Sequence, residues 1–518
     1  MEEERKMETS IFEIIGPVMI GPSSSHTAGM ARIGMMANRI LQVDAASVRL
    51  TLSPKMRTTY YGHRSDAALF GGTLGMSEDD PEIRDAIAIA HANGVETKVD
   101  FLEEGKYPEN SARVTVYTKD GEEYSVFGTS IGGGSILISE IDRVPMRLTA
   151  DTWHVIVWSE TELAKETFAG AKEVQQGISE KQEYVTCGTF LEKPDESMLE
   201  LLRGQNMVKK ISLASPVLAY GSSKRHVEWI SSCDSVCEYA EKENLTLAET
   251  AVRYESLRSG FSEKVIRDRM HEQWLLMKES VKKGQEEHQL LYGLTSGKDG
   301  KMLMQAVEKE ETISGGTIPL ATAMALGVME YNGSMGCIVA APTAGSSGIA
   351  PGCMTALQQV HQLSDKQIED GLFVSALIGV IMAACDVSFS GSVGGCQGEV
   401  GVSSAITSAG MASIFTEDKE AIMHAMAICM KNLLGLVCDP IAAPIEVPCI
   451  KRNAVGVANA YISSDMALAG VRSFIPPDEV IDALIDVEKR LPSELKCATI
   501  GGLACTKTAV CTRKKLTQ

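Results

Sequence analysis

Three cysteines in the C-terminal region stand in segments that glycine or proline interrupts. Cys396 follows a pair of glycines, Cys438 precedes an Asp-Pro pair, and Cys449 follows a proline. Such segments end helices and leave backbone N–H groups free to bond the sulfurs of an iron–sulfur centre. From the spacing alone, three buried structural cysteines are the simpler interpretation. Their position in the most apolar part of the chain instead favours a metal centre, in which three thiolates on a four-iron cluster leave one iron open as a Lewis acid.

Two segments near the N-terminus combine serine with histidine. Ser24, Ser25 and His26 follow two Gly-Pro pairs and precede an apolar stretch, so we predict that this loop opens a helix. Hydroxyl and free N–H groups at a helix start favour binding of a carboxylate. His63 has a similar loop-to-helix position, where an imidazole can act as acid, base or orienting group. The alternatives are a helix cap with spare serines and a surface histidine.

A third polar segment lies between two apolar stretches of the C-terminal region. Thr343, Gly345 and Ser346 offer hydroxyl and amide groups with little bulk, and we interpret them as a carboxylate cradle. A plain turn is the alternative. Ser390 lies shortly before Cys396 and is a further candidate for substrate binding near the metal.

Five of the remaining cysteines are most simply core thiols, namely Cys187, Cys337, Cys353, Cys385 and Cys429. Cys233 and Cys237 lie four residues apart on a predicted helix, so a metal pair is an alternative there. Cys505 and Cys511 in the C-terminal tail are further exceptions, since a tail cysteine could occupy an open iron in the resting state. Thirteen cysteines in a chain whose N-terminus has no apolar signal sequence indicate a reducing compartment. We therefore expect a cytoplasmic protein.

Charge and hydropathy limit the classes of partner. The 518-residue chain has a formal net charge of −19, which argues against nucleic acid or an anionic membrane as a main partner. Its most apolar uncharged stretches, near 315–329 and 371–385, are shorter than the roughly 20 residues that span a bilayer. We expect both to be buried helices.

The elements that must position these residues change character along the chain. Residues from about 11 to 147 indicate an α+β region, and residues from about 149 to 215 a βαβαβ-like pattern. A charged helical segment follows, and from about residue 295 apolar helices rich in small residues dominate. We predict strands at 47–53, 112–118, 154–159, 184–191 and 208–215, and helices at 82–94, 162–175, 196–204, 235–258 and 263–284.

Seven segments together resemble one enzyme family over nearly the whole chain. GPSSSHTAG, GHRSD and SIGGG are similar to the beta part of the iron–sulfur L-serine dehydratases. APTAGSSGIAPG, SGSVGGCQGEVG, LGLVCDP and VPCIKRNA are similar to the alpha part. The resemblance implies a single chain in which the beta part precedes the alpha part.

The resemblance also implies a domain organisation. It places a beta domain related to a substrate-binding regulatory domain at 1–148, a degenerate ACT-like domain at 149–218 and a mostly α-helical, cluster-binding alpha domain at 219–518. The first loop of the ACT-like stretch, SETELAKETF, lacks the glycine that is usual for a ligand site, which argues against amino-acid sensing there. Asp386 stands where the family usually has asparagine, so an extra carboxylate lies near the site in sequence.

The activity that the resemblance implies is conversion of L-serine to pyruvate and ammonia without pyridoxal phosphate. A [4Fe–4S] cluster held by Cys396, Cys438 and Cys449 would activate the hydroxyl. We expect His63 and His26 to handle protons, and the active site to lie between the N-terminal and C-terminal regions. The predicted substrate-binding residues are Ser24, Ser25, Thr343, Gly345, Ser346 and Ser390.

Three other functions compete with this one. A related lyase would act on threonine or cysteine, and a pyridoxal-phosphate dehydratase would need a phosphate loop that no segment supplies. A non-catalytic amino-acid sensor with a structural zinc–thiolate site is the alternative from another class. We expect a homodimer, with L-serine as the small-molecule partner.

Overall fold

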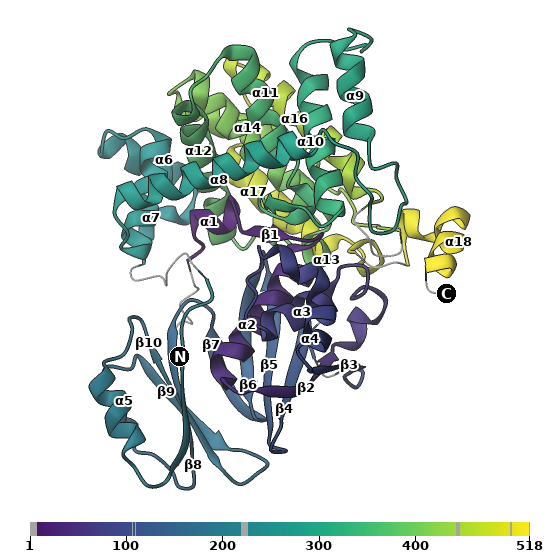
Figure 1. Cartoon of the computed structure of the whole chain (residues 1–518). Coiled ribbons are helices and arrows are strands. Elements are labelled where there is room, and N and C mark those ends of the chain that lie inside the picture. Colours follow the sequence, from purple (N-terminus) through teal and green to yellow (C-terminus); the bar gives the residue numbers. More distant parts are fainter. Residues whose placement is uncertain are drawn as a thin grey trace. The chain divides into compact units, whose positions relative to one another are not determined.

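The structure is a computed structural model that describes residues 8–105, 107–108, 110–218, 226–441, 446–497 and 500–516. The chain forms two compact units (Figure 1). The α/β unit comprises Ser25–Ser222, and the helical unit combines the described residues up to Ser24 with those from Ser223 onward. The prediction of sheets in the N-terminal region and a mostly helical C-terminal region is confirmed. The predicted domain boundaries stay predictions.

The larger sheet of the α/β unit has the strand order β3-β2-β4-β5-β6-β7. Its strands are β2 (Ala45–Leu52), β3 (Glu96–Phe101), β4 (Ser111–Thr118), β5 (Glu123–Gly132), β6 (Ser135–Ile141) and β7 (Val144–Thr149). Only the β2–β3 pair is parallel within the described strands. The strands predicted at 47–53 and 112–118 are confirmed as β2 and β4, and the helix predicted at 82–94 as a 3-10 turn followed by α4 (Ala86–Ala92).

Two helices that directly follow the predicted histidine segments pack closely together. They are α2 (Gly29–Leu41) and α3 (Ser65–Thr73). A Cβ atom on Gly34 would lie 2.2 Å from the carbonyl oxygen of Leu69, and one on Gly72 would lie 2.1 Å from that of Ala31. Glycine is therefore required at this crossing, and the crossing fixes the starts of both helices relative to each other.

The smaller sheet has the order β11-β8-β10-β9, with every pair antiparallel. It consists of β8 (Trp153–Ser159), β9 (Glu173–Ile178), β10 (Tyr184–Phe190) and β11 (Val208–Ala214), with α5 (Glu196–Arg203) before the last strand. The strands predicted at 154–159, 184–191 and 208–215 and the helix at 196–204 are confirmed.

The helix predicted at 162–175 is wrong. That segment holds only a 3-10 turn, Lys165–Thr167, and then enters β9. Gly170 interrupts it with a φ of +82°, in the left-handed region. Leu163 and Phe168 are buried in the core that β8 forms with α5, so they cover the sheet without a helix. The apolar residues whose spacing predicted a helix instead pack against the sheet from an irregular segment.

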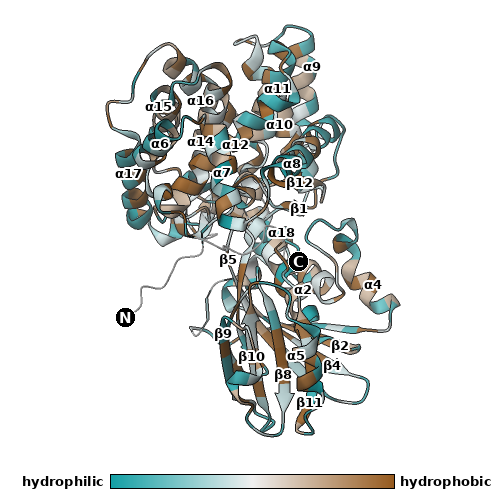
Figure 2. Ribbon diagram, turned by 90° about the vertical axis from the view of Figure 1, so that its left-hand side faces the viewer, coloured by the Kyte–Doolittle hydropathy of each residue, from teal (hydrophilic) through white to brown (hydrophobic). Residues whose placement is uncertain are grey.

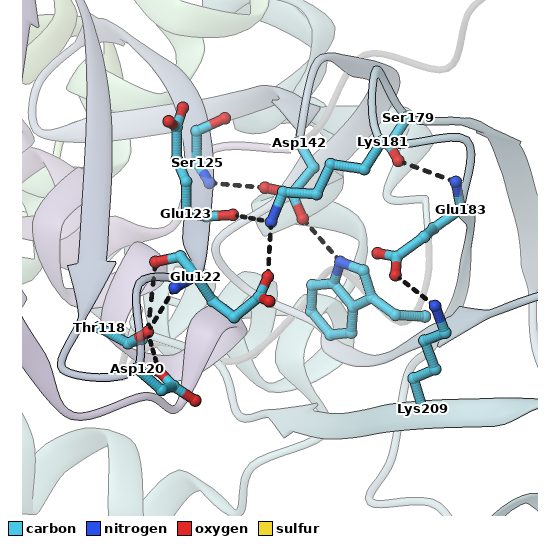
Figure 3. Close-up of polar contacts among 11 residues, drawn as sticks. Thr118, Asp120, Glu122, Glu123, Ser125, Asp142, Ser179, Lys181, Glu183 and Lys209 are labelled. Carbon is cyan, nitrogen blue, oxygen red and sulfur yellow. Dashed lines mark hydrogen bonds and ion pairs between the residues drawn. The ribbon is translucent and has the colours of Figure 1, made fainter.

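Polar contacts join the two sheets within the α/β unit (Figure 3). The indole Nε1 of Trp158 donates to Oδ2 of Asp142 over 2.7 Å, and Oδ1 of that carboxylate accepts from the backbone N of Ser125 over 2.6 Å. Lys181 of the smaller sheet donates to Glu122 over 3.1 Å. The smaller sheet is thus anchored to the β5–β6 side of the larger one.

The helical unit contains the following described helices. They are α1 (Ile11–Ile14), α6 (Cys233–Lys242), α7 (Leu247–Ser259), α8 (Glu263–Lys283), α9 (Asp299–Glu308), α10 (Thr317–Gly333), α11 (Ile349–His361), α12 (Asp365–Ala384), α13 (Gly391–Gly394), α14 (Val402–Phe415), α15 (Lys419–Lys431), α16 (Cys449–Leu468), α17 (Pro477–Arg490) and α18 (Lys507–Leu516). The helix predicted at 263–284 is confirmed as α8, and the one predicted at 235–258 is divided into α6 and α7.

Helix α14 lies at the centre of this unit, in contact with α12, α15 and α16. All its residues from Val402 to Ala412 are buried, and Figure 2 shows apolar residues along its length. Helix α12 is the one described helix long and apolar enough to span a membrane. Within the structure, 72% of its most apolar window is buried, so the buried helix predicted near 371–385 is confirmed.

The described residues up to Ser24 belong to the helical unit because they are built into its core. The backbone N of Ile11 donates to the buried carboxylate of Glu255 over 3.1 Å. Strand β1 (Val18–Ile20) pairs antiparallel with β12 (Cys337–Val339). The polar segment that contains Thr343 follows β12 directly, so this two-stranded ladder fixes its start.

Candidate metal centre

The sulfurs of Cys396 and Cys438 come together with a carboxylate oxygen of Glu399. These three ligand atoms lie within 4.8 Å of one another. The two thiols are almost completely buried, and Glu399 is partly buried. Two cysteines that are distant in sequence therefore share one site with an acidic side chain.

Local backbone structure explains the position of Cys396. It follows α13 and Gly395, whose φ of +73° lies in the left-handed region, and it precedes a π-helical turn that leads into α14. The backbone N of Gln397 donates to Leu436 O over 2.9 Å, and its side-chain Oε1 accepts from Gly435 N over 2.8 Å. Gln397 thereby ties the Cys396 segment to the segment that carries Cys438.

Cys449 lies in the same region but outside the tight group. It is the first residue of α16 and is 7% exposed. Among the described residues, its sulfur is not part of the set within 4.8 Å. Burial raises the pKa of the Cys449 thiol, and the neighbouring Cys396 and Glu399 raise it further. The third predicted ligand is thus close enough to interact electrostatically with the other two.

Glu399 is a candidate functional residue that the sequence analysis did not assign. Burial raises the pKa of its carboxyl to about 7, against the lowering effects of a hydrogen bond with Thr343 and the charge of Arg452. A Cβ on Gly391 would lie 2.6 Å from Glu399 Oε2. The glycine therefore leaves the space that the carboxyl occupies. In sequence, the only signal was its place three residues after Cys396.

The predicted carboxylate cradle lies beside Glu399. Thr343 bonds to that carboxyl, and a Cβ on Gly345 would be 3.5 Å from its Oε1. The hydroxyl of Ser346 contacts Thr343 Oγ1 at 3.1 Å and donates to Ala341 O over 3.2 Å, so it supports the shape of the loop. These three predicted residues therefore come together at the centre.

Two further predicted positions lie on the segment that leads to Cys396. Ser390 is the N-cap residue of α13, and its Oγ lies 2.8 Å from Ser392 Oγ. Asp386 is exposed, with a φ of +71°. Asparagine and aspartate are the residues that tolerate this left-handed conformation best after glycine. The backbone therefore accommodates aspartate at this position as well as the asparagine that the resemblance implies.

The tail cysteine next to the centre is Cys497. Its backbone N donates to Cys438 O over 2.7 Å, and Cys438 N donates to Leu495 O over 2.8 Å. Hydrogen bonds with the thiols of Cys396 and Cys497, followed by burial, raise the pKa of Cys438. Cys505 and Cys511, which the sequence analysis singled out, are both exposed.

The predicted histidines come together in the α/β unit. The rings of His26 and His63 stack with centroids 4.5 Å apart, and Thr27 Oγ1 donates to His63 O over 2.7 Å. A π-helical turn, Ser24–Ala28, carries the first histidine, and the boundary between the two units falls inside it, between Ser24 and Ser25. Both of these serines are buried.

Both imidazoles are neutral at physiological pH. Burial lowers the pKa of His26 to about 4, and burial together with the neighbouring His26 lowers the pKa of His63 well below its usual value. The Nδ1 atom of His63 is buried and has no hydrogen-bond partner among the described residues. A neutral ring with an unpartnered nitrogen can accept a proton.

We expect acid to destabilise the α/β unit through His26. Between the unfolded pKa of 6.5 and the folded value of about 4, the unfolded state binds more protons, so stability falls as pH falls. This difference corresponds to about 3 kcal/mol. Hydrogen exchange in the strands at pH 7 and pH 4.5 measures the loss, and His26→Gln should lose less. Equal losses in the two proteins would contradict this assignment.

Comparison with known proteins gives matches to both halves of the chain. The family model for the serine dehydratase alpha chain matches residues 242–504. The probable L-serine dehydratase alpha chain of Bacillus subtilis is 42% identical over 241 residues, which cover 46% of this chain and 80% of that protein. The probable beta chain from the same organism is 40% identical over 29% of this chain and 67% of its own length. L-serine dehydratase 1 of Escherichia coli is 24% identical over 96% of this chain and 98% of its own length.

Proposed function

The chain belongs to the serine dehydratase family, and from this premise we propose that it is an L-serine ammonia-lyase that forms pyruvate and ammonia. The observation that carries the proposal is the group formed by the buried Cys396 and Cys438 with the partly buried Glu399. This group lies within the residues that the alpha-chain model matches. The relatives with matching regions are named as L-serine dehydratases and their alpha and beta chains.

The donor set fits an iron–sulfur cluster. Soft thiolate ligands select iron–sulfur clusters or zinc, and none of the thirteen cysteines, all of which lie in the described part of the chain, forms a disulfide. We propose that Cys396, Cys438 and Cys449 hold a [4Fe–4S] cluster. When bound, that cluster supplies an open Lewis-acidic iron that makes the serine hydroxyl a better leaving group.

Residues of the chain would transfer the protons and bind the carboxylate of the substrate. Elimination removes the α-proton and the hydroxyl group as water, and the enamine product then tautomerises and is hydrolysed to pyruvate and ammonia. Neutral His63 would accept the α-proton at Nδ1, with His26 stacked on it as the orienting partner. Thr343 and Gly345 would bind the carboxylate. Ser24 and Ser25 remain proposed carboxylate ligands on the strength of the sequence.

Glu399 is proposed to hand a proton to the departing hydroxyl from its carboxyl oxygen. The structure supports this role because the carboxyl lies beside two cluster ligands and is hydrogen-bonded to Thr343. General acid catalysis by a positioned side chain is worth roughly 10²–10⁴-fold. An amide at the same position keeps the shape of the side chain but cannot donate that proton.

The variant Glu399→Gln is therefore expected to lower kcat by roughly 10²-fold or more while it retains the cluster. Pyruvate formation and iron content, measured on the same anaerobic sample, give the two readouts. Glu417→Gln at an exposed position is the matched control and should leave both unchanged. A Glu399→Gln enzyme with the kcat of the unaltered protein would remove Glu399 from the mechanism.

Substrate choice separates the proposed activity from its alternatives. Steady-state rates of the anaerobic protein on L-serine, L-threonine and L-cysteine are the test. We expect kcat/KM to be highest for L-serine. Preference for either of the other two would support a related lyase instead, and no turnover of any would support the sensor. We also propose that the protein is cytoplasmic and forms a homodimer. The assignment of the larger sheet to a beta domain and of the smaller sheet to an ACT-like domain is likewise a proposal, which rests on the resemblance.

A further inference from the structure

Arg452 reaches from the helix of one predicted cluster ligand to the segments of the other two. It lies in the first turn of α16, three residues after Cys449. Its Nη1 lies 3.3 Å from the sulfur of Cys396 and donates to it. The same nitrogen donates to Val437 O over 2.6 Å, directly before Cys438. One guanidinium on the helix that begins at Cys449 therefore contacts the segments of both other cysteines.

A buried ion pair fixes the orientation of this guanidinium. Its Nη2 lies 2.6 Å from Oδ1 of Asp439, and the two side chains are 16% and 5% exposed. The other carboxylate oxygen of Asp439 accepts from the backbone N of Leu503 over 2.8 Å, which attaches the C-terminal tail. The planar fork of arginine can make these bonds together, whereas the single ammonium of lysine cannot reproduce their geometry.

The neighbouring Asn453 extends the same arrangement to the carboxylate cradle. Its Nδ2 donates to Gly345 O and to Cys449 O, each over 2.9 Å, and its Oδ1 accepts from Gly348 N over 3.1 Å. The first turn of α16 thus contacts the segments of Cys396 and Cys438 through Arg452, and the carboxylate cradle through Asn453.

A cationic hydrogen-bond donor at a cluster sulfur has a predictable chemical effect. It withdraws negative charge from the thiolate and stabilises the more reduced cluster, because hydrogen bonds to sulfur and net charge set the reduction potential. It also holds the ligand in place, and loss of such supporting partners typically weakens metal binding roughly 10- to 100-fold. Oxidative loss of iron should therefore be slower with Arg452 present.

We propose that Arg452 is a positioning residue that holds Cys396 and Cys438 for the cluster and lowers the charge on the Cys396 thiolate. This inference rests on the proposed cluster. Arg452 would act through its hydrogen bond to the Cys396 sulfur and its ion pair with Asp439, without direct contact with the substrate.

The experiment compares Arg452→Gln, Arg452→Lys and Asp439→Asn, each purified anaerobically with its cluster. We expect both arginine variants to release iron to a chelator roughly 10-fold faster or more and to show a lower midpoint potential. Asp439→Asn keeps the bond to Cys396 and removes a negative charge, so it should speed iron release without lowering the potential. Arg472→Gln, which removes an ion pair with Asp418 elsewhere in the helical unit, is the matched control.

Three outcomes would overturn the inference in distinguishable ways. A cluster with unchanged potential and iron release in both arginine variants would overturn it alone and leave the proposed function standing. Equal potentials but faster release in all three variants would reduce Arg452 to a purely structural residue and overturn its effect on charge. Unaltered protein without an iron–sulfur cluster would overturn this inference and the proposed function together.

Discussion

Cys438→Ala is expected to lose its iron–sulfur cluster and with it pyruvate formation. The thiol of Cys438 contacts that of Cys396, and its backbone carbonyl accepts a hydrogen bond from the backbone N of Cys497, so this residue touches both neighbouring cysteines. Lewis-acid stabilisation is worth several kcal/mol, so turnover should fall on the order of 10³-fold or more. Iron content and a pyruvate assay on the same anaerobic preparation measure both effects.

The control for this variant must also remove a buried thiol. Cys187→Ala meets that condition, because Cys187 is fully buried in β10 of the smaller sheet. We expect it to keep its iron and activity, apart from a loss of stability. Because Cys497 lies next to Cys438, the double variant Cys438→Ala/Cys497→Ala should show whether the neighbour can substitute. Full iron content and full turnover in this double variant would exclude Cys438 as a ligand.

His63→Ala is expected to show the opposite combination, a retained cluster with lost turnover. Its imidazole is 4% exposed, neutral at pH 7 and unpartnered at Nδ1 among the described residues. Loss of a general base typically costs roughly 10²–10⁴-fold in kcat. Iron content should equal that of the unaltered protein, and added imidazole should restore part of the rate.

The matched control is His91→Ala, which removes an exposed histidine of the same unit. We expect its kcat and KM to be those of the unaltered protein. Full activity in His63→Ala would exclude His63 from catalysis and would leave Glu399 as the main candidate for proton transfer. Loss of the cluster in His63→Ala would instead indicate a role in stability of the whole protein.

Most of the secondary structure follows from local patterns in the sequence. The long helix α8 and the buried helix α12 carry hydrophobic periodicity or an unbroken apolar run, and both are predicted. The segment 162–175 has helical spacing, yet it does not form a helix, because Gly170 interrupts it and Phe168 packs onto the smaller sheet. Local propensity does not report such tertiary contacts.

The site was predictable only where residues stand in recognisable motifs. Cys396 and Cys438 lie in loops with such motifs, and the structure brings them together. Glu399 and Arg452 also stand in such motifs, but they become functional candidates only through contacts with residues far away in sequence, which no spacing rule reveals. The same reason explains the tail, where Cys497 adjoins Cys438 through backbone pairing while the more conspicuous Cys505 and Cys511 are exposed.

Metal analysis of anaerobically purified protein tests the central claim most directly. Iron and acid-labile sulfide are measured per chain, and Mössbauer spectra are recorded with and without L-serine. The account predicts a brown protein with about four irons and about four sulfides per chain, in which L-serine changes the environment of one iron. A colourless protein that contains zinc or no metal and still converts L-serine to pyruvate would contradict it.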